Sequence, residues 1–110
     1  MKIYISGPIS GRPLAQTRAE FAAAAAAVES RGHEAVNPCK TQDILRPETT
    51  SWRQYMLVAL ALLDACDAVL LLDGWQESKG ARLEYETALT QHKRIFAELA
   101  EIPENQEAQP

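Results

Sequence analysis

The chain has 110 residues, a length that corresponds to one domain. Hydrophobic residues make up 46% of the sequence and aromatic residues only 6%, so we expect a globular interior built mostly from small and aliphatic side chains. The formal net charge of −4 provides no basic field for a nucleic-acid backbone. This charge argues against a nucleic-acid polymer as a partner and favours a small ligand.

Cysteine spacing and hydropathy indicate the cellular location that we expect for the protein. Cys39 and Cys66 lack the spacing of metal ligands, and no signal peptide precedes the first predicted strand. The longest apolar stretch, Met56–Leu63, is far shorter than the roughly 20 residues of a membrane span. We therefore expect a soluble cytoplasmic protein with free thiols, no metal site, no cofactor and no membrane contact.

The first third of the chain predicts a strand, a loop and a helix. Lys2–Ser6 alternates β-branched and aromatic residues with others, as strands do. A loop from Gly7 to Pro13 leads into a helix from Leu14 to about Arg31, which contains an alanine run of high helix propensity. Gly32 then ends this helix.

The middle of the chain predicts a short strand at Glu34–Asn37 and a long loop at Pro38–Ser51. Ser51 or Thr50 is placed to cap a helix over Trp52–Ala65. Ala68–Leu72 is a short unbroken apolar run, which is typical of a strand buried on both faces.

The last third predicts a helix, a strand and a tail. Ser78 is a candidate N-cap for a helix from about Gly80 to His92, and Arg94–Leu99 predicts a short strand. Glu101–Pro110 is almost without apolar residues, so we expect a domain over residues 1–100 followed by a disordered tail over residues 101–110.

Alternating strands and helices, with connections too long for hairpins, predict a parallel sheet with helices on both faces. We expect a single small doubly wound α/β domain, flavodoxin-like or Rossmann-like, with four or five strands. In such folds ligands bind where the carboxyl ends of the strands meet, at the point where the strand order reverses. The strand Lys2–Ser6 should therefore lie beside Ala68–Leu72.

Two loops should meet at this point. The first contains two glycines, a serine and an arginine, which can turn backbone N–H groups and a guanidinium toward an anion or a sugar, although a purely structural turn has the same composition. The second loop and the helix after it carry several polar or aromatic side chains. The candidate binding residues are Gly7, Ser10, Gly11, Arg12, Trp75, Ser78 and Gly80, and Asp73, Glu77 and Glu84 supply carboxylates.

Glu84 differs from the other acids by its position. It lies one turn into the predicted helix, four residues after Gly80, whose missing side chain leaves room for a ligand. A carboxylate near a helix N-terminus is favoured in its ionised form, as a nucleophile must be, although acids are common there for electrostatic reasons alone.

Several segments resemble one protein family. They are Tyr4–Gly11, Trp52 with Tyr55 and Met56, Cys66–Ala68, and the pattern GW-x-x-S-x-GA-x-x-E that ends at Glu84. Together they resemble the small, phage-associated relatives of the nucleoside 2-deoxyribosyltransferases, a branch of unknown function (DUF4406-like). The resemblance extends to about Phe96. It implies a flavodoxin-like fold, a nucleoside or nucleotide ligand, and a homodimer or larger homo-oligomer.

The resemblance also implies roles for single residues. Better-studied relatives cleave or transfer the bond between 2-deoxyribose and base through a glutamate, which by position is Glu84. Tyr4 falls where the transferases have an aromatic hydroxyl near the nucleophile. Ser78 and the loop at residues 7–12 are similar to the corresponding parts of 2′-deoxynucleoside 5′-phosphate N-hydrolases, which favours a nucleotide over a nucleoside.

One position departs from the family pattern. Ala59 stands where relatives carry an aspartate that protonates the leaving base. We expect an aspartate at that position to reach the crevice, and in its absence Asp73 or Asp64 could supply the proton. Two functions follow from the sequence: an N-glycosidase or transferase with Glu84, Tyr4 and Asp73 as catalytic residues, or a nucleotide-binding module of weak or lost activity. A structural domain without a ligand is the third possibility.

Overall fold

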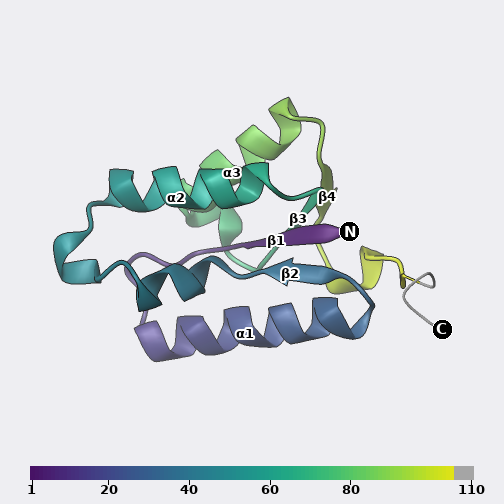
Figure 1. Cartoon of the computed structure of the whole chain (residues 1–110), viewed down its shortest axis with the longest axis horizontal. Coiled ribbons are helices and arrows are strands. Elements are labelled where there is room, and N and C mark those ends of the chain that lie inside the picture. The colour runs from purple at the N-terminus through teal and green to yellow at the C-terminus, as the bar shows by residue number, and fades with distance from the viewer. Residues whose placement is uncertain (106–110) are drawn as a thin grey trace.

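A computed structural model describes residues 1–105 of the chain as one four-stranded parallel sheet flanked by helices (Figure 1). The strands are β1 (Lys2–Ser6), β2 (Glu34–Val36), β3 (Ala68–Leu71) and β4 (Arg94–Phe96), in the spatial order β2-β1-β3-β4. The architecture is α/β and consistent with a flavodoxin-like fold. The predicted parallel pairing of the first strand with the apolar run is confirmed, with Tyr4 opposite Val69.

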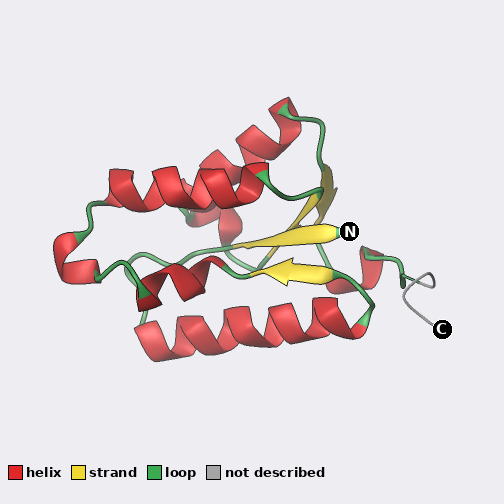
Figure 2. Ribbon diagram, viewed as in Figure 1, coloured by secondary structure: helices red, strands yellow, loops and turns green. Residues whose placement is uncertain are grey.

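Three α-helices cover the two faces of this sheet (Figure 2). They are α1 (Leu14–Ser30), α2 (Trp52–Asp64) and α3 (Lys79–Thr90). Side chains of β1 alternate between the faces: Ile3 and Ile5 pack in the cluster with Phe21 of α1, whereas Tyr4 packs in the cluster with Leu63 of α2. Helix α1 therefore covers one face, and α2 and α3 cover the other.

The predicted caps of two helices are present. Ser51 accepts a hydrogen bond from the backbone N–H of Gln54, whose side chain accepts in return from the backbone N–H of Ser51. Ser78 caps α3 by accepting from the backbone N–H of Ala81. Helix α1 is followed by Gly32 in the left-handed conformation, with a φ of +86°.

The long loop and the end of the last strand differ from the prediction. The long loop contains 3₁₀ turns at Pro38–Asp43 and Pro47–Thr49. The last strand ends at Phe96 and not at Leu99, because the Glu101 carboxylate accepts from the next two backbone N–H groups, at 2.9 and 2.8 Å, and a 3₁₀ turn follows. A fifth strand is absent from residues 1–105.

Residues 101–105 pack on the body of the domain, whereas we expected a disordered tail from residue 101. Ile102 is 1% exposed and belongs to the cluster beneath α1. Its carbonyl accepts from Arg31 Nη1 at 2.8 Å, and the backbone N–H of Asn105 donates to the carbonyl of Arg31 at 2.8 Å. The rest of the expected tail, residues 106–110, lies outside the described residues.

The described helices also bear on the membrane expectation. Among residues 1–105, none of them combines the length and apolar character needed to cross a bilayer.

The contacts of Ile102 lead to a stability prediction. Replacing Ile102 by alanine should lower the free energy of unfolding by about 2–4 kcal/mol, because the substitution removes buried aliphatic atoms and leaves a cavity. Ile44→Ala is the matched control: Ile44 is 83% exposed, so its truncation should change stability by about 0.5 kcal/mol or less. Urea denaturation of the two variants measures both effects. Equal losses for the two would show that residues 101–105 do not pack on the domain in solution.

Candidate functional site

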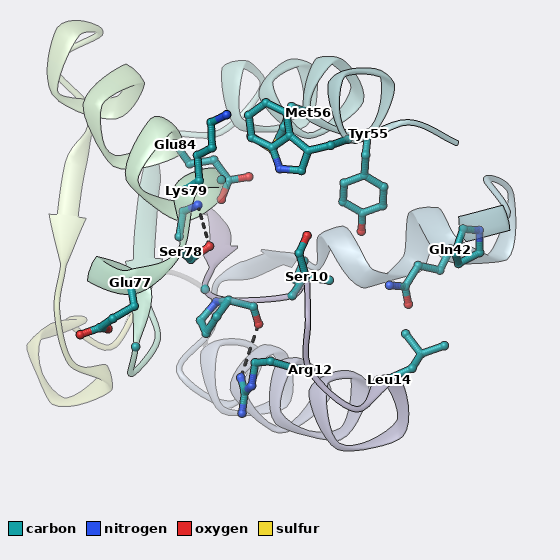
Figure 3. A pocket seen from close by; sticks show the side chains of 18 of the residues that line it. Ser10, Arg12, Leu14, Gln42, Tyr55, Met56, Glu77, Ser78, Lys79 and Glu84 are labelled. Atoms are coloured by element: carbon teal, nitrogen blue, oxygen red, sulfur yellow. Dashed lines mark hydrogen bonds between the residues drawn. The ribbon is translucent and has the colours of Figure 1, made fainter. Parts of the chain in front are cut away.

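A cleft of about 1010 Å³ opens where β1 and β3 end (Figure 3). One side is formed by the loop after β1, and another by the segment after β3 together with the start of α3. The remaining wall comes from the long loop and the first turn of α2, which place Gln42, Trp52 and Tyr55 on the cleft. The predicted position of the site, between the first strand and the apolar run, agrees with this geometry.

Glu84 is the buried acid of the cleft. It is 5% exposed, and both of its carboxylate oxygens accept hydrogen bonds from β1. The hydroxyl of Tyr4 donates to Oε2, and the hydroxyl of Ser6 donates to Oε1 at 2.7 Å. Since side chains alternate along a strand, Tyr4 and Ser6 point to the same face of the sheet, where α3 supplies the carboxylate.

The environment of Glu84 sets its acidity. Burial raises its pKa from 4.5 to about 6, and the hydrogen bonds from Tyr4 and Ser6 act in the opposite direction. Burial, followed by the charge of Glu84, raises the pKa of Tyr4 well above its ordinary value. The phenol therefore keeps its proton and acts as a donor, so Glu84 carries the negative charge of the pair above about pH 6.

Most of the predicted site residues lie together. The residues that line the cleft from the predicted set are Gly7, Ser10, Arg12, Asp73, Ser78, Gly80 and Glu84, and Glu77 also lines it. The carboxylate of Glu77 points away from Glu84 (Figure 3). Tyr4 is fully buried behind Glu84, so it reaches the cleft only through that carboxylate.

Two predicted binding residues lie outside the lining of the cleft. The ring of Trp75 stacks on Tyr85, with centroids 4.6 Å apart, and packs against the buried cluster around Tyr4. Gly11 has a φ of +78°, so its role is to permit this turn of the backbone. These two residues support the loops but do not face the cleft.

Gly7 and Gly80 line the cleft for a reason that differs from the expected one. A Cβ at Gly7 would lie 2.9 Å from Cβ of Leu72, and one at Gly80 would lie 3.1 Å from Sδ of Met56. Both glycines therefore allow close packing of protein on protein, the first between the loop and the end of β3, the second between α3 and α2. Space for a ligand is a consequence of where these elements meet.

Arg12 is already engaged by neighbouring groups. Its guanidinium lies 3.0 Å from the Glu20 carboxylate and donates weakly to the carbonyl of Pro8 at 3.4 Å. The pairing lowers the pKa of Glu20. An anionic ligand would share this guanidinium with Glu20 or replace Glu20 as its partner.

Sequence reasoning missed several residues of the site. The alternation along β1 could have indicated Ser6, two residues after Tyr4. Lys79 lies with Nζ 4.5 Å from the ring centroid of Trp52, a contact that joins the starts of α3 and α2. Gln42 comes from the long loop and Tyr55 from the first turn of α2, and neither was among the predicted binding residues.

The structure corrects the expectation for Ala59 and Asp64. Ala59 is 2% exposed and does not line the cleft, so an aspartate there would be buried between α2 and the sheet. Helix α2 runs opposite to the strands, which places Asp64 at the other end of the sheet, where the side chain of Gln91 reaches it. Asp73 lines the cleft and is exposed.

Comparison with known proteins gives one family. Residues 1–97 match the family described as a domain of unknown function (DUF4406). No curated protein matched the chain. The match confirms the resemblance to DUF4406, and it provides no link to the deoxyribosyltransferases or to phages.

The pKa of Glu84 predicts a pH dependence of stability. Because the folded state binds this proton more tightly than the unfolded chain does, Glu84 costs stability at pH 7, and this cost disappears as the pH falls from about 6 to 4.5. The difference in unfolding free energy between the wild type and Glu84→Gln should shift by about 2 kcal/mol in favour of the wild type over this range. Urea denaturation at pH 7 and pH 4.5 measures it. A difference that stays flat contradicts burial as the dominant influence on Glu84.

Proposed function

Since the chain belongs to the DUF4406 family, whose description assigns no activity, we propose a function from the cleft itself. We propose that the protein binds a 2′-deoxynucleoside 5′-monophosphate and cleaves or transfers its N-glycosidic bond, with Glu84 as the nucleophile. The observation that carries this proposal is a buried carboxylate, oriented on both oxygens, at the base of a nucleotide-sized cleft.

The cleft offers separate surfaces for the parts of a nucleotide. The side chains of Trp52, Tyr55 and Met56 form a largely apolar wall against which a flat base can pack. Arg12 and Lys79 bring positive charge to the opening, where a phosphate can be held. The sugar then lies between these surfaces, with its anomeric carbon toward Glu84.

The proposed reaction follows the logic of a retaining glycosidase. One oxygen of Glu84 attacks the anomeric carbon, the bond to the base nitrogen breaks, and the base leaves with the electron pair and takes up a proton. Water, or the nitrogen of a second base, then attacks the anomeric carbon of the glycosyl ester and frees Glu84. Tyr4 and Ser6 hold the carboxylate in place before attack and donate to whichever oxygen carries charge.

Proton transfer to the leaving base is the step for which the cleft offers the fewest candidate residues. With Ala59 buried away from the cleft and Asp64 at the far end of the sheet, Asp73 is the aspartate that we propose for this role. A well-placed general acid contributes roughly 10²–10⁴-fold to such reactions.

A nucleotide-binding module without turnover is the second candidate function. The observation that favours it is that both oxygens of Glu84 already accept hydrogen bonds, which lowers the nucleophilicity of a carboxylate. In this role Glu84 would accept a hydrogen bond from a sugar hydroxyl. The homo-oligomer implied by the resemblance stays a prediction.

Release of free base distinguishes the two functions. The wild type is incubated with each 2′-deoxynucleoside 5′-monophosphate, and the products are separated by chromatography. We expect base release that Glu84→Gln abolishes and that Asp73→Asn slows by at least tenfold. Asp64→Asn is the matched control and should retain the wild-type rate, because Asp64 lies outside the cleft. Nucleotide-dependent thermal stabilisation without base release would favour the binding module.

Variants at Arg12 and Glu20 test whether Arg12 binds the 5′-phosphate of the ligand. Arg12→Ala should weaken binding of 5′-monophosphates by about tenfold or more and leave nucleosides nearly unchanged, because charge-assisted hydrogen bonds to phosphate are lost. Glu20→Gln should act in the opposite direction, since it frees the guanidinium from its present partner. Titration calorimetry with deoxyadenosine and its 5′-monophosphate measures both. Equal weakening of the two ligands by Arg12→Ala would contradict a phosphate contact.

A further inference from the structure

Gln42 presents its side-chain amide on the wall of the cleft opposite Glu84 (Figure 3). It belongs to the 3₁₀ turn Pro38–Asp43 in the long loop. The amide oxygen Oε1 accepts a hydrogen bond from Arg18 Nη1 at 3.1 Å. The second terminal nitrogen of this guanidinium, Nη2, donates to Oδ1 of Asp43 at 3.0 Å, so Asp43 holds the arginine beside Gln42.

This arrangement fixes the direction of the Gln42 amide. A guanidinium has only donors, so the group that faces Arg18 must be the amide oxygen. Rotating the amide by half a turn would set its N–H₂ group against the N–H groups of Arg18 and lose the hydrogen bond. The amide nitrogen Nε2 is consequently directed into the cavity, as Figure 3 shows. Within residues 1–105 it has no hydrogen-bond acceptor from the protein.

The position of Gln42 determines which part of a ligand it meets. If the anomeric carbon lies at Glu84, a base that extends along Tyr55 and Met56 brings the edge farthest from the sugar toward Gln42. On that edge hypoxanthine, guanine, uracil and thymine carry an oxo group, which accepts a hydrogen bond. Adenine and cytosine carry an amino group there, which donates one.

We propose that Arg18 is a positioning residue that makes Gln42 a fixed donor, and that the cleft thereby selects 6-oxopurine and 4-oxopyrimidine nucleotides over their amino counterparts. This inference rests on the proposed nucleotide function and adds the class of base. An amino group opposite the amide N–H₂ leaves two donors facing each other without an acceptor. The resulting discrimination is roughly tenfold in affinity.

The ion pair between Arg18 and Asp43, beside Gln42, can be removed by mutation without unfolding the domain. The side chains of Arg18 and Asp43 are 40% and 62% exposed, and exposed pairs contribute little to stability. Variants at these positions should therefore remain folded, and thermal unfolding of each variant without ligand confirms this.

The test compares ligands that differ at the exocyclic group and at the ring nitrogen beside it, which is a donor in the oxo bases and an acceptor in the amino bases. Dissociation constants for 2′-deoxyinosine and 2′-deoxyadenosine 5′-monophosphates, and for the deoxyuridine and deoxycytidine pair, are measured by titration calorimetry. Where a ligand is cleaved, kcat/KM replaces the dissociation constant. The wild type should prefer the oxo member of each pair by about tenfold. Equal affinities within both pairs would overturn the proposal.

Three variants distinguish a fixed orientation of the Gln42 amide from a contact that does not depend on Arg18. Gln42→Glu replaces the donor by an acceptor of the same shape and should invert the preference. Arg18→Met lets the amide turn and should bring the ratio close to one, chiefly by improving the amino ligands. Arg53→Met, at an exposed arginine on α2, is the matched control and should keep the wild-type ratio.

The outcomes also separate this inference from the function on which it rests. A wild-type preference that Arg18→Met leaves unchanged shows that Arg18 does not position the amide, while the nucleotide function stands. Absence of binding by all four nucleotides overturns the proposed function and this inference together.

Discussion

The burial of one carboxylate organises this molecule. An acid that is 5% exposed costs free energy unless donors compensate its charge, and the donors here come from a different element, β1. Tyr4 and Ser6 can reach Glu84 only if β1 lies beside β3 and α3 crosses their shared face. Ser78 contributes by fixing where α3 begins, and thus which residue falls one turn inside it. The polar contact therefore couples the strand order to the helix register.

Local signals were sufficient for the parts of the fold that depend on short-range chemistry. The apolar run of β3, the caps Ser51 and Ser78 and the left-handed turn at Gly32 all act within a few residues, and each was predictable from the sequence. The end of β4 and the packing of Ile102 were not. Both depend on the path of the chain after Phe96, where the sequence indicated a strand continuing to Leu99 and a tail from residue 101.

The candidate site shows the same division. The loops that follow β1 and β3 could be assigned to one site because parallel strands bring their carboxyl ends together. The long loop has no periodicity, so neither the contact of Gln42 with Arg18 nor the place of Gln42 on the cleft could be read from it. Trp75 illustrates the opposite error. It lies in a loop that was predicted to bind a ligand, but its ring stacks on Tyr85 and faces the protein.

Both ends of the described chain contact the turn after α1. The Met1 amine contacts Nδ1 of His33, the other ring nitrogen of His33 meets the carbonyl of Pro103, and Asn105 donates to Arg31. This turn lies at the amino ends of β1 and β2 (Figure 1). The residues that line the cleft follow the carboxyl ends of β1 and β3. The domain can therefore be tethered to a surface, or inserted into a loop of a host protein, through two neighbouring attachment points that leave the cleft open.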